Sequence, residues 1–322
     1  MTLVEMPAVH TLATLAQVDD QARDYIGAAR APNTLRGYRA DWGHFSAWCA
    51  TQGLTALPAT PQTVSRYLTT QAGQRKTGTL SRRLSAIAQA HKVAGHSSPT
   101  QDATLRLVWA GIRRTHGTAQ VGKTATAVDE LRRMVTTLPD SLLGLRDRAL
   151  LLLGFAGAFR RSELVALDVA DVRSTTDGLI VTVRRGKTDQ EGTGRAIGIP
   201  YGSTPATCPV RAVAAWRLAA DIQVGPLLRS VNRHGHTHAG RMSDRSVALI
   251  VKRAAAAAGL DPALYAGHSL RAGLATAAAG AGVSERVIAQ QTGHKSMVVL
   301  RRYIRAGTLF APGENAAAAI GL

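Results

Sequence analysis

The sequence predicts a mainly α-helical protein with a small β-sheet, built from an N-terminal helical domain and a C-terminal α+β domain. Three observations support this prediction. The chain has 322 residues, a length typical of two domains. Apolar residues recur every three or four positions through much of residues 1–120 and again after Ser243, as they do in amphipathic helices. Between these regions, Gly178–Arg184 and Arg195–Pro200 are short runs typical of strands.

The N-terminal domain, residues 1–120, is expected to contain four helices. The first starts at Pro32-Asn33-Thr34, with Thr34 as its expected N-cap. Its apolar stripe consists of Leu35, Tyr38, Trp42, Phe45 and Cys49. The second helix begins at Pro61, and the third covers 79–93 with Arg82 and Arg83 facing outward. The fourth covers 102–114.

A linker is expected over residues 116–126, which lack apolar periodicity and are rich in Gly, Thr and Ala. The domain boundary therefore falls near 120–125, and the C-terminal domain covers 126–322.

Thr126 and Asp129 together form a capping signal for the next helix. A further helix is expected over Ser141–Gly157, with a short helical turn from Ser162.

The two expected strands are joined by a polar turn, so they form a β-hairpin that carries Lys187 near its tip. From Ser243 onward the chain is again expected to be helical, over 243–258, 269–281, 284–291 and 296–303. The tail, 312–322, has the pattern of a short helix with Ile320 and Leu322 as its apolar residues.

Charge identifies the class of partner. Lys and Arg number 39 against 21 Asp and Glu, a net charge of +18 with an isoelectric point near 11.1. Residues 1–120 carry a net charge of +7 and the remainder +11, so both domains are expected to contact the same polyanion. Such an excess favours a nucleic acid; the alternative is a basic surface that serves only solubility. The 45% hydrophobic content argues against a disordered chain.

Several other classes of protein are disfavoured. Two distant cysteines, Cys49 and Cys208, argue against a disulfide framework and against a cysteine-based zinc site. The first residues lack the basic and apolar regions of a signal peptide. The longest apolar run, 149–155, is too short to cross a bilayer. We therefore expect a soluble cytoplasmic protein without a membrane partner.

Four short motifs carry the chemistry. Arg160 is followed three residues later by Glu163, and Lys187 lies on the hairpin. The segment 268–271 reads His-Ser-Leu-Arg, and Tyr303 follows His294 by nine residues. Each motif alone is common in proteins. An Arg at a helix start usually has a structural role, and a single Tyr usually packs against its neighbours rather than acting in catalysis.

In this order the motifs resemble the tyrosine recombinase (phage integrase) family. The resemblance rests on GAFRRSELVALDVADV, then RRGKT, then GHSLRAGLATAAAGAGVSERVIAQQTGHKSMVVLRRYI. It covers about 126–305 and extends more loosely to the N-terminal helices, which look like the family's SAM-like core-binding domain. The segments HFSAWC, GHSLRAG and YIRAG are most similar to the Cre-like branch.

The resemblance implies a role for each residue. Arg160 and Arg271 would bind the non-bridging oxygens of a phosphodiester through planar guanidinium forks. His268 and His294 would add hydrogen bonds, and His268 would accept the proton of Tyr303, the nucleophile. Tyrosine needs this help because its ordinary pKa is about 10.

Two further roles concern the leaving group and the orientation of the site. Lys187 would protonate the departing 5′ oxygen. Glu163 would orient Arg160 or a histidine; its alternative is a plain carboxylate on a helix surface. Alignment on Ser162-Glu163-Leu164 selects Arg160 rather than Arg161 as catalytic.

The implied activity is site-specific DNA recombination through a covalent 3′-phosphotyrosine and a Holliday junction, without metal, ATP or another cofactor. The implied partners are double-stranded DNA with an inverted-repeat site and three further copies of the chain in a homotetramer, with the tail 312–322 docking into a neighbour. Association with a prokaryotic nucleoid follows. The alternatives are a type IB topoisomerase, which shares this chemistry, and a DNA-binding protein without catalysis.

Metal-dependent readings compete with this one. The alternating His234, His236 and His238 could bind a transition metal, but no cysteine or acidic cluster lies nearby, and the resemblance places them in an exposed loop. Asp168 and Asp171 are expected to be surface groups rather than half of a two-metal site. Candidate DNA contacts in the N-terminal domain are Arg36, Arg39, Lys76, Arg82 and Arg83.

Overall fold

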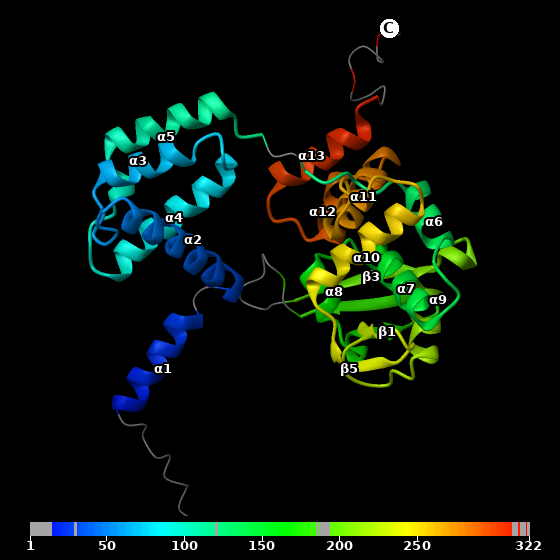
Figure 1. Ribbon diagram of the computed structural model, residues 1–322. Coiled ribbons are helices and arrows are strands. Elements are labelled where there is room, and N and C mark those ends of the chain that lie inside the picture. Colours follow the sequence, from blue (N-terminus) through cyan, green and yellow to red (C-terminus); the bar gives the residue numbers. More distant parts are fainter. Residues whose placement is uncertain are drawn as a thin grey trace, which may run out of the picture. The chain divides into compact units, whose positions relative to one another are not determined.

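The computed structural model describes residues 15–28, 31–119, 122–184, 186, 194–310, 315 and 320. The chain forms two compact units that meet in sequence between Val121 and Gly122 (Figure 1). The first is helical, and the second combines helices with two small antiparallel sheets. The predicted fold class, mainly helical with a small sheet in the second half, is therefore confirmed.

The N-terminal unit contains five described α-helices and one 3-10 turn. They are α1 (Leu15–Ala28), α2 (Pro32–Thr51), α3 (Pro61–Gln71), α4 (Thr77–Val93), η1 (Pro99–Gln101) and α5 (Ala103–His116). The predicted apolar stripe of α2 reaches the core through Phe45 and Cys49, which are fully buried beside Tyr67 and Ile87. Helix α1 was not predicted.

The start of α2 differs from its prediction. Thr34 is not the N-cap, because the helix begins at Pro32 and Ala31 occupies the cap position. Proline is favoured in the first turn, where its missing N–H has no helical partner to lose. Side-chain caps do start two other helices of this unit: Thr60 accepts from the backbone N–H of Thr63, and Asp102 accepts from that of Leu105.

The C-terminal unit begins with α6 (Val128–Thr136), α7 (Leu142–Ala156) and α8 (Arg161–Ala166). Helix α7 is apolar on most sides, and Leu150–Leu153 form the centre of the core. The capping signal assigned to Thr126 and Asp129 was wrong. Ala127 is the N-cap of α6, and its N–H donates to Glu130, while Thr126 is fully buried and its N–H donates to the carbonyl of Ser269.

A three-stranded antiparallel sheet follows, in the order β1 (Val172–Ser174), β2 (Gly178–Val183) and β3 (Arg195–Pro200). Strands β2 and β3 match the predicted hairpin, and their register pairs Val183 with Arg195. Strand β1 was not predicted; the short turn η2 (Val169–Asp171) leads into it.

The stretch with alternating histidines lies on a second antiparallel hairpin: His234 and His236 are in its turn, as expected of a loop, whereas His238 is in a strand that was not predicted. Strands β4 (Arg229–Val231) and β5 (Thr237–Arg241) pair antiparallel, and His238 lies within β5. The side chain of Asn232 closes the turn, since its oxygen accepts from the N–H groups of His234 and His236. Helix α9 (Pro209–Ala219), which follows the turn η3 (Pro205–Thr207), was also not predicted.

Asp168 and Asp171 are not simple surface groups either. Asp171 is buried, and its carboxylate accepts from the N–H of Asp168 and pairs with Arg184. Asp168 in turn pairs with Arg184 and Arg241. These ion pairs connect η2, the end of β2 and β5.

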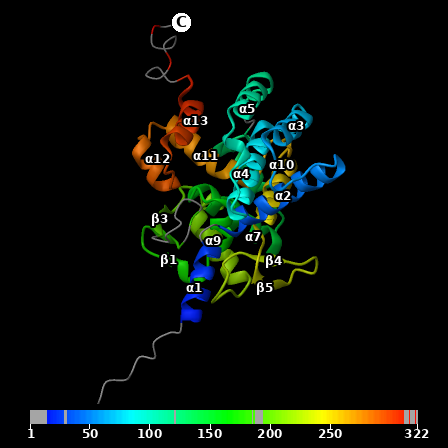
Figure 2. The same ribbon diagram turned by 90° about the vertical axis from the view of Figure 1, so that its left-hand side faces the viewer.

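Four helices complete the unit: α10 (Asp244–Ala257), α11 (Gly267–Gly280), α12 (Glu285–Thr292) and α13 (Met297–Thr308). Helices α11, α12 and α13 lie side by side in both views (Figure 2). The crossing of α11 and α13 depends on Gly307, because an added Cβ there would lie 2.2 Å from the carbonyl oxygen of Thr276. This close approach places Tyr303, on α13, against α11. The expected tail helix over 312–322 lies outside the described residues, apart from Asn315 and Ile320.

Candidate active site

Arg160 and Glu163 form the first part of the site, at the N-terminus of α8. Arg160 is the N-cap residue, and its backbone N–H donates to Oε2 of Glu163 over 3.0 Å. Its Nη1 donates to Oε1 of the same carboxylate over 2.5 Å, and its Nη2 donates to the carbonyl of Gly293 over 3.3 Å. Glu163 is buried. Glu163 is thus not an exposed carboxylate on the helix surface, and it contacts Arg160. Its role in orienting Arg160 stays a prediction.

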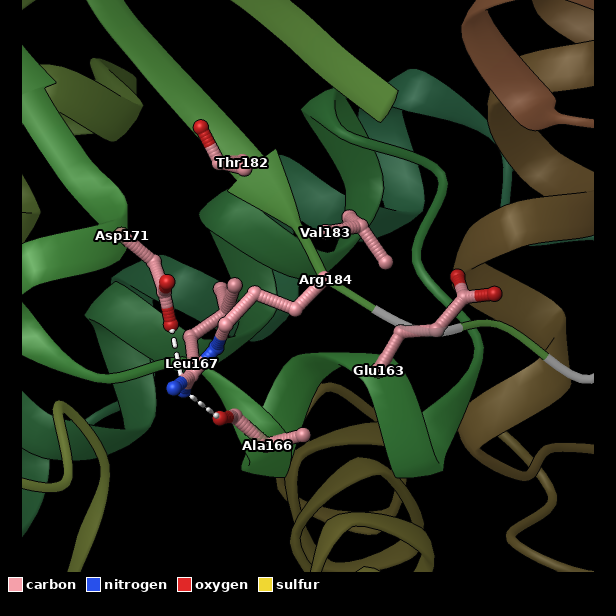
Figure 3. Close-up of a pocket in the computed structure, with 7 residues that line it drawn as sticks. All are labelled: Glu163, Ala166, Leu167, Asp171, Thr182, Val183 and Arg184. Carbon is pink, nitrogen blue, oxygen red and sulfur yellow. Dashed lines mark hydrogen bonds and ion pairs between the residues drawn. The ribbon is translucent and has the colours of Figure 1, made fainter. Parts of the chain in front are cut away.

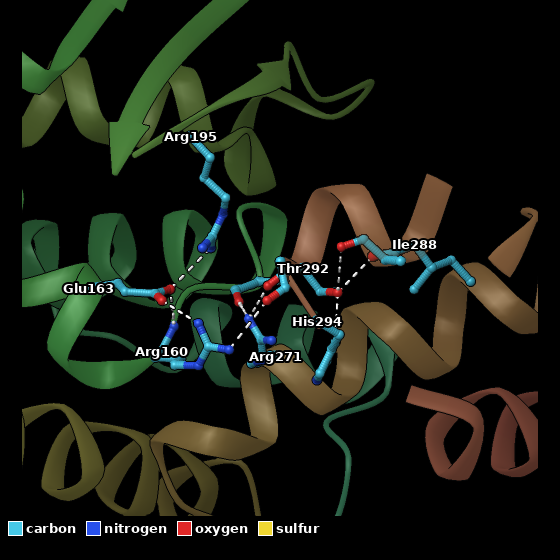
Figure 4. A network of polar contacts seen from close by, with 10 residues as sticks. Arg160, Glu163, Arg195, Arg271, Ile288, Thr292 and His294 are labelled. Atoms are coloured by element: carbon cyan, nitrogen blue, oxygen red, sulfur yellow. Dashed lines mark hydrogen bonds and ion pairs between the residues drawn. The ribbon is translucent and has the colours of Figure 1, made fainter. Parts of the chain in front are cut away.

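Arg195 shares the Glu163 carboxylate, although no sequence motif marks it as a site residue. Its Nη2 donates to Oε2 over 3.1 Å from the first residue of β3 (Figure 4). Its guanidinium packs against Gly293, where an added Cβ would lie 2.6 Å from Nη1. Because Arg195 is 32 residues from Glu163 in the chain, only the β2–β3 pairing brings them together.

The side chain of Glu163 is an ionised carboxylate at neutral pH. Burial alone would raise its pKa, but the hydrogen bond from the backbone of Arg160 and the charges of Arg195 and Arg160 together lower the pKa below its ordinary value. One carboxylate therefore lies between two guanidinium groups, and the site keeps an excess of positive charge.

Arg271, on α11, is almost completely buried, with 1% of its surface exposed. Its Nη1 donates to the carbonyl oxygens of Ala158 and Thr292. Its Nη2 is buried without a hydrogen-bond partner among the described residues. Burial, followed by the charge of Arg160, lowers the pKa of Arg271 to about 10, so the group stays protonated at neutral pH. An anion would supply the acceptor that Nη2 lacks.

Ala158 adopts an uncommon backbone conformation to meet Arg271. Its φ is +48°, in the left-handed region that costs an L-residue roughly 1–2 kcal/mol. The carbonyl of this strained residue accepts from Arg271 over 2.8 Å. Two positions later, Arg160 begins the capped turn of α8. The segment 158–160 therefore fixes the position of Arg271 through the carbonyl of Ala158, and it leads directly into Arg160.

His294 follows Gly293, the C-cap of α12. Its Nδ1 lies 2.7 Å from the hydroxyl oxygen of Thr292. Burial, then the charges of Arg271 and Arg160, lower the pKa of His294 to about 3. The imidazole is therefore neutral at physiological pH, with one N–H to offer.

Tyr303 and His268 complete the arrangement. The phenolic oxygen of Tyr303 lies 2.7 Å from Nε2 of His268, which is on the first turn of α11. The ring of Tyr303 is 5.9 Å from that of His294 and 6.0 Å from that of His268, between centroids. The two histidines thus flank the phenol.

Of the seven residues predicted for the catalytic set, six are brought together. Arg160 and Glu163 meet Arg271 and His294 through the turn at 292–293, and His268 and Tyr303 are in contact. Arg161 turns the other way: its side chain is 45% exposed and pairs with Asp244 over 3.7 Å. Lys187 lies outside the described residues, but its neighbour Gly186 lies against Glu163, with an ideal Cβ 3.0 Å from Oε1.

A pocket borders the other side of Glu163. It is lined by residues of α8, η2 and β2, namely Glu163, Ala166, Leu167, Asp171, Thr182, Val183 and Arg184. Within it, Arg184 pairs with Asp171 and donates to the carbonyl of Ala166 (Figure 3). The guanidinium of Arg184 is therefore paired with groups of the protein itself. These contacts stabilise the end of β2, the strand that precedes Lys187 in sequence.

One of the predicted DNA contacts was wrong. Arg83 is buried, with 6% exposed, because its guanidinium donates to Gln71 and lies 3.8 Å from Asp41 and 5.8 Å from the centre of the Tyr67 ring. Helix α4 turns Arg83 into the core, where it joins α2 and α3. Arg36, Arg39 and Lys76 are exposed, and Arg82 is half exposed while paired with Asp41.

Within the described part of the chain, no group of three His, Cys, Asp or Glu side chains could hold a metal ion. The described helices also include none that is long and apolar enough to cross a membrane.

Comparison with known proteins decides the family. The model of the phage integrase family matches residues 125–308, and the model of the phage integrase N-terminal SAM-like domain matches residues 23–96. An integrase/recombinase XerD homolog from Selenomonas ruminantium is 42% identical over 294 residues, which cover 90% of this chain and 86% of that protein. The chain belongs to the phage integrase family of tyrosine recombinases.

Other relatives of this tyrosine recombinase agree. Tyrosine recombinase XerC of Myxococcus xanthus is 27% identical over 85% of this chain and 87% of its own length. The fold resembles XerH recombinase bound to palindromic difH DNA after cleavage, with a TM-score of 0.60 and 17% identity over 82% of this chain and 72% of that one. It also resembles a lambda integrase tetramer bound to a Holliday junction, with a TM-score of 0.57 and 16% identity over 92% and 79%. The narrower Cre-like assignment stays a prediction.

Gly293 of the recombinase should be sensitive to substitution. Its φ is +65°, and an added Cβ would meet Arg195 at 2.6 Å. Gly282 is the matched control, since its φ is +77° but an added Cβ would meet nothing within 4 Å. We expect Gly282→Ala to lower the free energy of unfolding by about 1–2 kcal/mol through backbone strain. Gly293→Ala should lose about 1 kcal/mol more, because Arg195 is displaced from Glu163. Urea denaturation measures both, and equal losses would contradict this role of Gly293.

Stability should also depend on the protonation of His294. An unfolded histidine has an ordinary pKa near 6.5, whereas the folded group stays neutral down to about pH 3. Between these values the unfolded chain binds the extra proton, so the free energy of unfolding falls as the pH decreases from about 6.5 toward 3. Denaturation at pH 7.5 and pH 5.0 should show a smaller decrease for His294→Gln than for the wild type. An unchanged decrease would mean that His294 is not the group responsible.

Proposed function

We propose that this tyrosine recombinase cleaves and rejoins DNA at specific sites through a covalent 3′-phosphotyrosine formed by Tyr303. The observation that carries the proposal is the contact of 2.7 Å between Tyr303 and His268, next to two arginines held by a buried network. A nucleophile in contact with a proton acceptor, beside donors for an oxyanion, is the arrangement that phosphoryl transfer requires.

The proposed chemical step uses this contact between Tyr303 and His268 and assigns the leaving-group proton to Lys187. The oxygen of Tyr303 attacks the phosphorus and forms the O–P bond, while His268 takes the phenolic proton. The bond from phosphorus to the 5′ oxygen breaks, and Lys187 donates the proton that this oxygen needs. Religation reverses these transfers, and since the phosphodiester energy is kept in the Tyr–P bond, no ATP is consumed.

The arginines stabilise the charge that develops on the phosphate. Arg160 is held through Glu163, and Arg271 has an unsatisfied Nη2 available for a phosphate oxygen. Guanidinium groups of fixed orientation supply this stabilisation without reorganising during the reaction. Their charge fills the role that a metal ion has in many nucleases.

Partners are proposed on the same basis. The excess charge of +18 suits double-stranded DNA. The similar lambda integrase is a tetramer on a Holliday junction, which supports a homotetramer on two synapsed inverted-repeat sites as the working form of this chain.

A nicked DNA substrate tests the activity. The protein first selects its site from a pool of random duplexes, and the selected site is then nicked beside the scissile phosphate so that the short released strand diffuses away. We expect a covalent protein–DNA adduct in the presence of EDTA. An adduct that forms only after a divalent metal is added would contradict the mechanism.

Lys187 is tested by the leaving group. We expect Lys187→Ala to cleave ordinary DNA about 10²–10⁴-fold more slowly, the usual contribution of a general acid. On DNA with a 5′-bridging sulfur, which leaves without protonation, the variant should recover most of the wild-type rate. Failure to recover on the sulfur substrate would remove Lys187 from this role.

A further inference from the structure

Arg195, which the predicted catalytic set does not include, contacts both groups that accept hydrogen bonds from the side chain of Arg160. Nη1 of Arg160 donates to Oε1 of Glu163 over 2.5 Å, and its Nη2 donates to the carbonyl of Gly293 over 3.3 Å. Arg195 donates to the other oxygen of Glu163 over 3.1 Å (Figure 4). Its guanidinium also packs against Gly293. Arg195 therefore touches both acceptors of the Arg160 guanidinium.

The two oxygens of the Glu163 carboxylate have different partners. Oε2 accepts from the backbone N–H of Arg160 over 3.0 Å and from Nη2 of Arg195 over 3.1 Å. Oε1 accepts from the side chain of Arg160. The last torsion of a glutamate is only weakly restricted by its own side chain. Two donors on Oε2 therefore fix the plane of the carboxylate and direct Oε1 toward Arg160.

Burial makes the charge of Arg195 matter to Glu163. The carboxylate is 1% exposed, against 16% for Arg160 and 21% for Arg195. Burial raises the pKa of Glu163, and the backbone hydrogen bond of Arg160 and then the charge of Arg195 lower it. Nε of Arg195 is itself buried without a hydrogen-bond partner among the described residues, which costs stability. An ion pair that served stability alone is expected to satisfy its buried donors.

We propose that Arg195 is a positioning residue that holds the ionised Glu163 carboxylate and the turn at Gly293 in place, and so directs the guanidinium of Arg160 at the scissile phosphate. This inference rests on the proposed DNA cleavage, since that reaction supplies the phosphate. Arg195 acts through Arg160 and does not itself touch the substrate.

A double-mutant cycle with Arg160 tests this dependence. Single-turnover adduct formation is measured on the selected nicked DNA. We expect Arg195→Met to be about 10–10²-fold slower than the wild type, the loss of one hydrogen bond between charged groups. In the Arg160→Lys background the same change should cost no more than about threefold, because lysine has no guanidinium for Glu163 and Gly293 to hold. Equal losses in the two backgrounds, or no loss in the wild-type background, would overturn the proposal.

Arg253→Met is the matched control. Asp147 is a second buried carboxylate shared by two arginines, Arg146 and Arg253, and Arg253 donates to it over 2.5 Å from α10. Arg253→Met therefore removes the same kind of ion pair away from Arg160. We expect it to lower the free energy of unfolding in urea while adduct formation stays within about twofold of the wild type. A loss of rate as large as that of Arg195→Met would show that such pairs act through stability alone, and would overturn the proposal.

The charges around Glu163 come from several elements. Arg160 on α8, Arg195 on β3 and Arg271 on α11 all interact with it. Asp171 and Arg184 line the pocket on its other side, but they pair with each other. Removing Arg195 therefore leaves Arg160 as the one described cation with a hydrogen bond to the carboxylate.

Carbon NMR reads the ionisation of Glu163 directly, on the full chain labelled with ¹³C at the glutamate carboxyl. The Glu163 signal is the one missing from Glu163→Gln. We expect Arg195→Met to raise the pKa of Glu163, and Arg195→Lys, which keeps the charge, to leave it low. An equal pKa in the wild type and Arg195→Met would overturn the proposal. The titration needs no DNA, so it tests Arg195 even if Tyr303 forms no adduct, a result that would contradict the proposed function instead.

Discussion

Tyr303→Phe should abolish the covalent protein–DNA adduct. The substitution removes only the phenolic oxygen that lies 2.7 Å from His268, while the ring keeps its place between the two histidines. Without the nucleophile no bond to phosphorus can form, so the adduct should decrease by at least about 10³-fold. Denaturing gel electrophoresis of labelled suicide substrate measures the adduct.

Binding and a second tyrosine provide the controls. Tyr303→Phe should still bind the selected DNA site, because the arginines proposed to contact the phosphate are intact. Tyr201→Phe is the matched variant: Tyr201 is exposed and packs against Arg211, so its adduct should equal that of the wild type. An adduct that persists in Tyr303→Phe would assign the nucleophile to another residue.

Arg160→Lys should slow cleavage by about 10²–10³-fold, whereas Arg161→Lys should have little effect. Lysine keeps the charge but cannot donate to Glu163 and the carbonyl of Gly293 while also facing the phosphate. One preorganised donor contributes a factor of this size. The side chain of Arg161 points instead toward Asp244.

Arg161→Lys is a close control for Arg160→Lys. Both substitutions are the same chemical change at neighbouring positions of one helix start, and rates are measured as single-turnover adduct formation at saturating protein. If Arg161→Lys were the slower variant, the assignment of Arg160 would be wrong. Equal small effects would show that neither guanidinium fork acts in the step.

Local patterns predicted much of the fold. The stripe of α2, the apolar run of α7 and the short strand-like runs of β2 and β3 each depend on near neighbours in sequence, and each is present in the structure. Burial within an element is harder to predict. Arg83 was expected on the outer face of its helix together with Arg82. In the structure it is buried, and Asp41 and Gln71 from two other helices supply partners for its guanidinium group.

The site was predicted only where a motif marks it. His268 and Arg271 are three residues apart on one helix, and Arg160 precedes Glu163 by one turn, so short spacing reveals both pairs. Arg195 and Thr292 carry no such mark. The contact of Arg195 with Glu163 depends on the pairing of β3 with β2, and the contact of Thr292 with His294 depends on the conformation of the turn after α12. Neither feature is visible in a short sequence pattern. The left-handed backbone of Ala158 gave no signal either, because glycine is the residue expected there.

The most direct test of the account is to identify the amino acid bonded to DNA. The adduct formed on the nicked substrate with EDTA is digested with protease and nuclease, and the residual nucleotide is located by mass spectrometry. We predict a nucleotide attached through its 3′ phosphate to the peptide that contains Tyr303. A nucleotide on any other residue, or attachment through a 5′ phosphate, would contradict the account.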